Sequence, residues 1–334
     1  MTPLVFSLPL RDRFRGVTVR EGVVVEGPAG WGEFAPFVEY DDAEAASWWA
    51  AAYEAAFVGW PAPVRDRVPV NGTVPAVGPE RAAEIVAGSG CATAKVKVAE
   101  PGQTPADDLA RVAAVREAIG PQGRVRVDAN GAWTVAEALA AVTALDAEVG
   151  LEYVEQPCRT VEELATLRRE TSVLIAADES IRKADDPLRV AELEAADVAV
   201  LKVAPLGGVR ACLDVAEQIG LPVVVSSAID SSVGLAAGVA LAAALPDLPY
   251  ACGLGTGAML LADVTDEPLR PESGFLPVRR PSVNRATFPA APVDRQRWWL
   301  DRLTRVPDLL AYPPFEGEEK VDKSANLGGR RPHE

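Results

Sequence analysis

The sequence predicts an α/β protein in which parallel strands alternate with helices and close into one barrel. From residue 67 onward, short β-branched runs alternate with Ala-, Glu- and Leu-rich runs of helical periodicity. Five of the short runs end in a charged residue, and neighbouring members of this series lie 23 to 31 residues apart, about one strand-plus-helix unit. These side chains meet at one mouth only if the sheet closes, so we favour a barrel over an open, doubly wound sheet.

The domain organisation follows from length and pattern. A chain of 334 residues holds a barrel of roughly 200–250 residues and a smaller unit. We expect an α+β domain at 1–66 and the barrel at 67–262. The Pro-rich stretch 263–315 is expected to return to the first domain, and the charged stretch 316–334 to be a flexible tail.

Within the first domain, three segments have distinct patterns. Residues 17–27 resemble a hairpin that turns at Glu21-Gly22. Residues 30–36 resemble a loop, and the Ala-rich stretch 43–60 resembles a helix.

In the barrel, continuous apolar runs such as 198–201 are typical of parallel strands buried on both faces. Helix starts carry capping boxes, as at Thr134 with Glu137 and at Thr160 with Glu163. The eight expected strands lie at 68–73, 93–98, 124–129, 151–155, 174–178, 197–203, 222–227 and 250–254. The seven expected helices lie at 78–88, 105–119, 134–148, 160–171, 187–195, 207–219 and 232–245.

Charge and composition argue against several classes of protein. The net charge of −15 disfavours a nucleic-acid partner. No apolar run approaches the roughly 18 residues of a membrane span, and the first residues lack the pattern of a signal peptide, so we expect a cytoplasmic protein with no membrane partner. The single histidine, His333, lies beside the C-terminus, which excludes a Ser-His-Asp triad or a His base within the fold. The widely spaced cysteines are expected to be buried thiols: Cys91, Cys158, Cys212 and Cys252.

Three acidic residues end successive expected strands: Asp128, Glu155 and Asp178. One such residue alone is better explained by a helix cap or a salt bridge at the barrel mouth than by a cation. Three together repel one another and need a cation to offset that repulsion. Oxygen ligands favour Mg²⁺, or Mn²⁺, over Zn²⁺. The sequence therefore predicts a hard-cation site.

Two lysines complete the series of charged strand ends, Lys97 and Lys202, and Lys95 lies two positions before Lys97 on the same face of its strand. Neighbouring ammonium groups lower each other's pKa, which suits a lysine base near neutral pH. Lys202 is expected to approach from the opposite side of the barrel. The alternative is that the lysines pair with the acids.

These motifs resemble the enolase superfamily, in its muconate-lactonizing subgroup. The resemblance rests on Lys95-x-Lys97, Asp128-Ala-Asn130, Glu155-Gln-Pro157, Asp178-Glu-Ser180 and Lys202. It implies an α/β fold, a (β/α)7β TIM-like barrel with an α+β capping domain built from the N-terminal region and the C-terminal segment. It implies Mg²⁺ held at Asp128, Glu155 and Asp178, with Lys97 and Lys202 on either side of a small carboxylate substrate.

Within this subgroup, several segments look most like the o-succinylbenzoate synthases: Arg126 to Asn130, Ser226-Ser227, and Gly253-Leu-Gly255-Thr256. This implies a Mg²⁺-dependent syn dehydration in menaquinone biosynthesis, with Lys97 as base and then acid. Lys202 and the metal would stabilise the developing negative charge. The residues expected to contact the substrate or to support the ligands are Lys95, Arg126, Asn130, Glu179, Ser226, Ser227, Gly253 and Gly255.

The short segment 11–20 lies where the family has a specificity loop. Its arginines, Arg11, Arg13 and Arg15, are either solvated surface or contacts for a succinyl carboxylate.

Two other functions stay open, and a third is disfavoured. An N-succinylamino-acid or other N-acylamino-acid racemase would use one lysine for each enantiomer. A muconate-cycloisomerase-like enzyme with another substrate would use the same constellation. A non-catalytic barrel is disfavoured, because all five charged residues are present. The oligomeric state is open.

Overall fold

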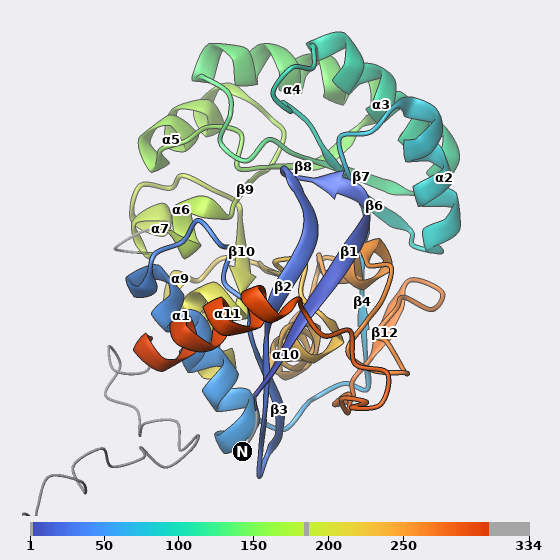
Figure 1. Ribbon diagram of the computed structural model, residues 1–334. Coiled ribbons are helices and arrows are strands. Elements are labelled where there is room, and N and C mark those ends of the chain that lie inside the picture. Colours follow the sequence, from blue (N-terminus) through green and yellow to red (C-terminus); the bar gives the residue numbers. More distant parts are fainter. Residues whose placement is uncertain (1–2, 184–186, 307–334) are drawn as a thin grey trace, which may run out of the picture.

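A computed structural model describes residues 3–183 and 187–306 of the protein. In this part of the chain, a three-stranded antiparallel sheet lies against a barrel built on a seven-stranded parallel sheet (Figure 1). The predicted α/β barrel with an α+β cap is confirmed. The expected tail at 316–334 and His333 lie outside the described residues.

The antiparallel sheet has the order β1-β2-β3, with β1 at Leu4–Phe14, β2 at Val17–Gly27 and β3 at Gly30–Phe34. Its first turn is Arg15-Gly16, and both residues have positive φ, 50° and 81°. Two successive positive φ values are the mark of a tight hairpin turn whose twist matches that of the flanking strands.

Two expectations for this sheet are wrong. Residues 17–27 form one continuous strand, with no turn at Glu21-Gly22, and 30–34 is a strand and not a loop. The glycines serve close packing: a Cβ on Gly22 would lie 2.4 Å from Ala35 Cβ, and one on Gly32 would lie 2.1 Å from Ala52 O. Glycine within a strand often marks such an approach of two backbones.

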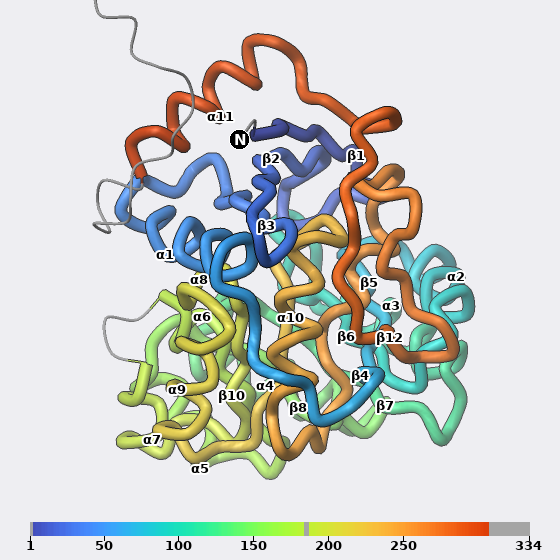
Figure 2. The backbone as a smooth tube through the Cα atoms, turned by 90° about the horizontal axis from the view of Figure 1, so that it is seen from below, coloured from blue at the N-terminus to red at the C-terminus, as the bar shows by residue number. Residues whose placement is uncertain are grey.

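The helix expected at 43–60 is confirmed as α1 (Asp42–Tyr53), which continues as the π-helical turn η1 (Glu54–Val58). The Asp41 carboxylate caps α1 by accepting a hydrogen bond from Glu44 N at 2.8 Å. The C-terminal helix α11 (Val293–Arg305) packs on β1 and β2, and Trp299 Nε1 donates to Glu21 Oε2 at 3.2 Å. Figure 2 shows the chain after the barrel returning beside β1 to β3.

The parallel sheet runs in the order β11-β10-β9-β8-β7-β6-β5. Residues Cys252 and Gly253 close it into a barrel, because they bridge Val70 on one side and Ser226 on the other. The eighth expected strand, at 250–254, is therefore reduced to these bridges. The strand expected at 68–73 is split into two. The strands are β4 (Arg67–Pro69), β5 (Gly72–Val74), β6 (Thr93–Lys97), β7 (Arg124–Asp128), β8 (Leu151–Glu155), β9 (Ile175–Ala177), β10 (Val198–Lys202) and β11 (Val223–Ser226), and β12 (Phe275–Pro277) pairs with β4.

Helices surround the parallel strands, and their expected positions hold except at 187–195, where only a four-residue helix forms. Short helices that the sequence did not predict follow β9 and β10 directly. The helices are α2 (Pro79–Ser89), α3 (Pro105–Ile119), α4 (Val135–Val149), α5 (Val161–Glu170), α6 (Glu179–Arg182), α7 (Arg189–Glu192), α8 (Val203–Leu206), α9 (Val209–Ile219) and α10 (Ser232–Ala244), followed by the 3₁₀ turn η2 (Gly255–Met259).

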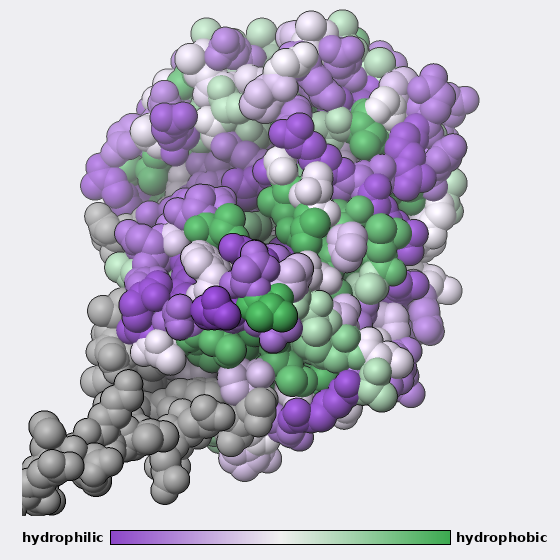
Figure 3. All heavy atoms as spheres, viewed as in Figure 1, coloured by the Kyte–Doolittle hydropathy of each residue, from purple (hydrophilic) through white to green (hydrophobic). Residues whose placement is uncertain are grey.

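The distribution of buried residues and of hydrophilic surface residues agrees with this architecture. All four cysteines are free and buried, as expected. Hydrophilic residues dominate the outer helices in Figure 3, whereas hydrophobic residues gather in the middle, where β1 and β2 cross the barrel. Among the described residues, no helix has the length and apolar character needed to span a membrane.

Candidate active site

A cavity lies between the C-terminal ends of the barrel strands and the antiparallel sheet. Its volume is about 730 Å³ including its open mouth. Active sites of barrel enzymes are found at this end of the strands. The barrel contributes Thr73, Lys95, Lys97, Asp128, Arg182, Lys202, Pro205, Ser226, Ser227, Ala228, Ile229, Gly253 and Thr256 to the wall, and the first domain contributes Phe14, Arg15, Val17, Phe37, Glu39, Tyr40 and Trp48.

One side of the cavity holds Lys95 and Lys97, which share a face of β6 because strand side chains alternate. Lys97 stands opposite Asp128 in the register of β6 and β7, and Asp128 stands opposite Glu155 in that of β7 and β8. Lys97 Nζ lies 2.5 Å from Asp128 Oδ2, and Lys95 Nζ lies 3.2 Å from the same oxygen and 2.6 Å from Glu155 Oε1. The lysines therefore pair with the acids, as the alternative expectation had it.

The two lysines differ in their protonation. Burial lowers the pKa of Lys97, and the neighbouring Lys95 lowers it further, although the Asp128 carboxylate opposes both effects. For Lys95, burial is outweighed by the charges of Glu155 and Asp128, so its pKa is raised. The expectation that both lysines have a lowered pKa is correct for Lys97 and wrong for Lys95. Asn130, which has a positive φ of 48°, accepts a hydrogen bond from Lys97 Nζ at 2.6 Å.

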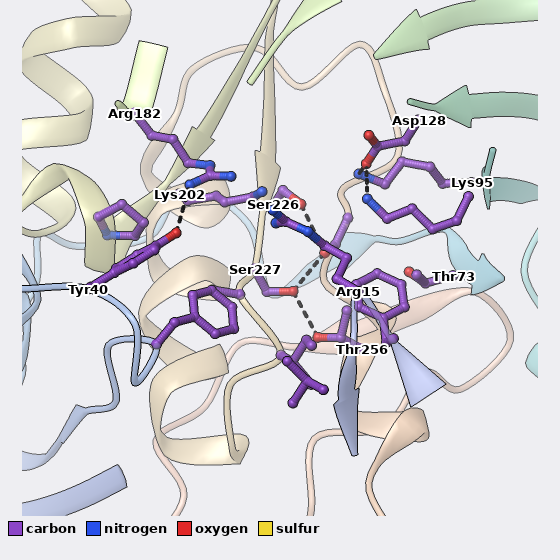
Figure 4. A pocket seen from close by; sticks show the side chains of 18 of the residues that line it. Arg15, Tyr40, Thr73, Lys95, Asp128, Arg182, Lys202, Ser226, Ser227 and Thr256 are labelled. Carbon is purple, nitrogen blue, oxygen red and sulfur yellow. Dashed lines mark hydrogen bonds and ion pairs between the residues drawn. The ribbon is translucent and has the colours of Figure 1, made fainter. Parts of the chain in front are cut away.

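The opposite side of the cavity holds Lys202, at the end of β10. Its Nζ lies 2.6 Å from Asp178 Oδ2, and Arg182 Nε lies 2.9 Å from Asp178 Oδ1. Figure 4 shows Lys95 and Asp128 on one side of the cavity, with Lys202 and Arg182 across from them. Burial opposes the charge of Asp178, but Arg182 and Lys202 outweigh it and lower the pKa of that carboxyl.

The three carboxylates suit a hard cation in their chemistry. All three are buried, and among the described residues no group donates a hydrogen bond to Glu155 Oε2. Burial first, and then the charge of Asp128, raises the pKa of Glu155 to about 7. Asp178 adds to that repulsion. Within 3–183 and 187–306, no group of three His, Cys, Asp or Glu side chains is close enough together to hold a metal ion. Here Lys95 bridges Asp128 and Glu155, while Lys202 pairs with Asp178. Oxygen-only donors and an acceptor without a partner fit Mg²⁺ or Mn²⁺.

Several expected substrate contacts do lie at the cavity. Ser226, Ser227 and Gly253 line it. Ser227 Oγ donates to Gly253 O at 2.9 Å and lies 2.8 Å from Thr256 Oγ1 (Figure 4). Asn130 Nδ2 donates to Glu179 Oε1 at 3.2 Å, so Asn130 links Lys97 to the α6 side of the site.

Arg126 and Gly255 lie elsewhere. Arg126 is two residues before Asp128 on the same face, which puts it one layer deeper in the barrel. There it stacks on Tyr153, with its guanidinium carbon 4.6 Å from the ring centre, and pairs with Glu152. A Cβ on Gly255 would lie 2.4 Å from Asn71 O, so this glycine serves backbone packing. Neither residue lines the cavity.

Of the three arginines considered for substrate contact, Arg11, Arg13 and Arg15, the last lines the cavity. The segment expected as a loop at 11–20 consists of the ends of β1 and β2 and their turn, and this turn carries Arg15 over the mouth (Figure 4). Arg15 Nη1 lies 3.9 Å from Glu179 Oε1. Arg11 donates to Ala258 O at 3.2 Å, and Arg13 lines a neighbouring groove.

Sequence reasoning missed Arg182 and the aromatic wall formed by Phe37, Tyr40 and Trp48. Arg182 Nη1 donates to Tyr40 Oη at 3.4 Å, which joins α6 to the first domain. The only signal in the sequence was the position of Arg182, four residues after Asp178, which is the spacing of a helical ion pair.

The fold and these paired charges define a class of protein, and comparisons with known families agree with it. Residues 79–282 match the family described as enolase C-terminal domain-like, and residues 5–56 match the enolase N-terminal domain-like family. The chain belongs to the enolase superfamily.

Curated relatives narrow this class. The chain is 66% identical over 298 residues to the o-succinylbenzoate synthase of Thermobifida fusca, which covers 89% of this chain and 94% of the relative. It is 59% identical over 309 residues to that of Mycolicibacterium smegmatis, covering 92% and 95%.

Solved structures support the fold. The L-Ala-D/L-Glu epimerase from Bacillus subtilis has a TM-score of 0.73 at 23% identity, covering 84% of this chain and 96% of that one. A muconate lactonizing enzyme from Pseudomonas fluorescens has a TM-score of 0.72 at 21% identity, covering 89% and 97%.

Proposed function

We propose that the chain is an o-succinylbenzoate synthase, which converts 2-succinyl-6-hydroxy-2,4-cyclohexadiene-1-carboxylate to 2-succinylbenzoate by syn loss of water. The observation that carries the proposal is the placement of Lys97 and Lys202 on opposite sides of one cavity, with buried carboxylates beside each. The identity of 58–66% to enzymes of that name over about nine-tenths of the chain supports it.

Lys97 is the base in this proposal. Its lowered pKa increases the fraction that is neutral and able to accept a proton. It removes the hydrogen on the ring carbon that bears the carboxylate. The same ammonium then protonates the hydroxyl on the adjacent carbon, so that a C–H and a C–O bond break, water leaves and the ring becomes aromatic. Asn130 holds Lys97 in place through its hydrogen bond of 2.6 Å.

Lys202 has an electrostatic role. It approaches from across the cavity, where its ammonium group stabilises the negative charge that moves onto the substrate carboxylate as the proton leaves. Asp178, fixed by Arg182, orients Lys202. Asp128, Glu155 and Asp178 would hold Mg²⁺, or Mn²⁺ in its place, which supplies further positive charge for that carboxylate.

Arg15 recognises the second carboxylate, at the end of the succinyl chain. It lies over the cavity mouth, and its ion pair with Glu179 is long, at 3.9 Å, so the guanidinium has hydrogen-bonding capacity left for a ligand. The neighbouring rings of Phe14 and Phe37 provide an apolar wall for the cyclohexadiene.

The test is formation of o-succinylbenzoate from its cyclohexadienyl precursor, with Mg²⁺ and then with a chelator. Rapid aromatisation that the chelator abolishes supports the proposal, and no turnover by a metal-loaded protein contradicts it. Two expectations from the sequence stay predictions: that this reaction belongs to menaquinone biosynthesis, and that the protein is located in the cytoplasm.

One observation also favours a second activity, racemisation of N-succinylamino acids, because lysines on opposite sides of a cavity can serve the two enantiomers. Chiral analysis in deuterated water separates the two activities, since racemisation exchanges the α-hydrogen. A muconate-cycloisomerase-like reaction has no such observation in its favour.

A further inference from the structure

The loop at residues 226–231, between β11 and α10, forms part of the cavity wall in a conformation that its sequence disfavours. Ile229 has a φ of +61°, in the left-handed region. A β-branched side chain in this region is a genuine outlier, and such a backbone conformation persists only where the surrounding structure holds it in place. Ser226, Ser227, Ala228 and Ile229 all line the cavity. Something outside the loop must therefore hold it.

Arg20, on β2, makes one of the restraining contacts. Its Nε donates to Ile229 O at 3.2 Å, and the other end of the guanidinium donates to Ala35 O. The side chain is only 2% exposed, and its guanidinium carbon lies 4.5 Å from the centre of the Phe37 ring. Arg20 thus joins the carbonyl of the strained residue to the rigid antiparallel sheet.

Glu33, on β3, makes the second contact. Its carboxylate accepts hydrogen bonds from Ser231 N and Gly234 N, each at 3.3 Å, and from the Ser231 hydroxyl. A Cβ on Gly234 would lie 2.7 Å from Glu33 Oε1, so the first turn of α10 is shaped to receive this side chain.

The loop contributes less to its own restraint. Asp230 Oδ2 accepts a hydrogen bond from Ala228 N at 3.1 Å, which tightens the turn locally. A second cavity lies behind the loop, lined among others by Glu33, Asp230 and Lys202, so packing alone does not fix it.

We propose that Arg20 and Glu33 are positioning residues, which hold loop 226–231 in its strained conformation and so shape the substrate cavity from the antiparallel sheet. Neither residue itself lines the cavity that holds Lys97 and Asp128. Both act on the shape of that cavity through this loop. The barrel's cavity wall is then complete only while the first domain is docked on it. The kinetic part of this inference rests on the proposed function, and the structural part does not.

The test compares wild type with R20K, E33Q and a matched control, R116K, in the full-length protein. R20K keeps the charge but cannot reach two carbonyls at once, and E33Q replaces one of the two acceptor oxygens of Glu33 with an amide donor. Arg116 also bonds carbonyl groups, those of Gly120, Gly123 and Val149, but at the far end of the barrel. Two quantities are measured: amide hydrogen exchange in peptides covering 226–235, and KM and kcat for o-succinylbenzoate formation.

We expect faster exchange of the 226–235 amides in R20K and E33Q, with KM raised roughly tenfold and kcat changed less than about threefold. R116K lowers thermal stability with neither effect. Unchanged exchange in both variants, or an unchanged KM in a variant whose loop exchanges faster, overturns the proposal. A wild-type protein without turnover contradicts the proposed function alone, because the exchange comparison still decides whether Arg20 and Glu33 hold the loop.

Discussion

Lys97 and Asp128 stand opposite each other in the register of β6 and β7, and their side chains meet at 2.5 Å inside the cavity. This pair has two consequences. It fixes the ammonium group of a buried lysine at one point of the wall, and it partly offsets the lowering of the Lys97 pKa that burial and Lys95 cause. The pKa of Lys97 therefore depends on the balance between burial and the opposing charges of Lys95 and Asp128.

Replacing Lys97 with alanine removes the group proposed to act as both base and acid. Each proton transfer is worth roughly 10²–10⁴-fold, so the rate of o-succinylbenzoate formation is expected to fall by more than about 10³-fold. Asp128 retains Lys95 at 3.2 Å, and the variant should fold. Steady-state rates and circular dichroism together check this. Near-normal turnover by a folded K97A protein rules out the assigned role.

Lys202 is proposed to stabilise charge without moving a proton, so K202M is expected to lose roughly 10²–10³-fold in kcat. K202R keeps a positive charge near the substrate and should retain more activity than K202M. A racemase would behave differently, because each lysine there transfers a proton for one enantiomer. Equal losses in K202R and K202M, together with α-hydrogen exchange in deuterated water, favour the racemase.

Arg15 provides a test of substrate recognition. R15Q keeps a polar side chain in the turn but loses the guanidinium proposed for the succinyl carboxylate. A lost charge-assisted hydrogen bond of about 1.5–3 kcal/mol raises KM by roughly 10–100-fold, with a smaller effect on kcat. R13Q is the matched control, since Arg13 lies on the same hairpin but lines the neighbouring groove. Equal KM values in the two variants would remove Arg15 from the recognition site.

Metal binding can be measured without turnover. A cation held at the three carboxylates binds the folded protein and not the unfolded chain, so millimolar Mg²⁺ should raise the melting temperature of wild type. Glu155 is the ligand to change, because its Oε2 has no hydrogen-bond partner among the described residues. E155Q should lose most of the Mg²⁺-dependent increase in melting temperature, and activity with it. The same increase in E155Q as in wild type would place the cation elsewhere.

The barrel was accessible from sequence because its signals are local. Capping boxes such as those at Thr134 and Thr160 mark helix starts, and both are present in the structure. The three-stranded sheet was not accessible in the same way. Gly22 and Gly32 read as turn and loop residues, but they are there so that Ala35 and α1 can pack closely, which depends on partners distant in sequence.

The residues of the site also fall into those that local sequence signals could predict and those that depend on the folded chain. Charged residues at strand ends were found because consecutive parallel strands end at the same mouth, and strand alternation put Lys95 and Lys97 on one face. The alternation of side chains along a strand shows which face a residue lies on, but not how deep in the barrel it lies. For this reason the sequence grouped Arg126 with Asp128, although Arg126 lies one layer below the cavity. The partners Arg182 and Arg15 reach the site through a short helix and a hairpin turn whose positions only the folded chain defines.

The raised pKa of Glu33 predicts an unusual dependence of the protein's stability on pH. Burial and then the charge of Asp230 raise its pKa to about 8, with Asp263 adding to this, while Ser231 and the positive charge of Arg20 lower it in part. An acid whose folded pKa lies above its unfolded value binds more protons when folded. Its contribution to stability is therefore greatest below about pH 4.5 and is lost as pH rises through about 8.

The measurement is urea unfolding of wild type and E33Q at pH 5 and at pH 8. Glutamine does not titrate, so E33Q is expected to lose less stability between the two pH values than wild type does, by up to a few kcal/mol. Glu155, whose pKa is also raised, contributes equally to the pH dependence of stability in both proteins, so its contribution cancels in the comparison. E33Q should be less stable than wild type at pH 5, since a carboxamide presents a donor to the amide groups at the start of α10. Parallel pH profiles for the two proteins would show that Glu33 titrates normally and that its burial is relieved by its three hydrogen bonds.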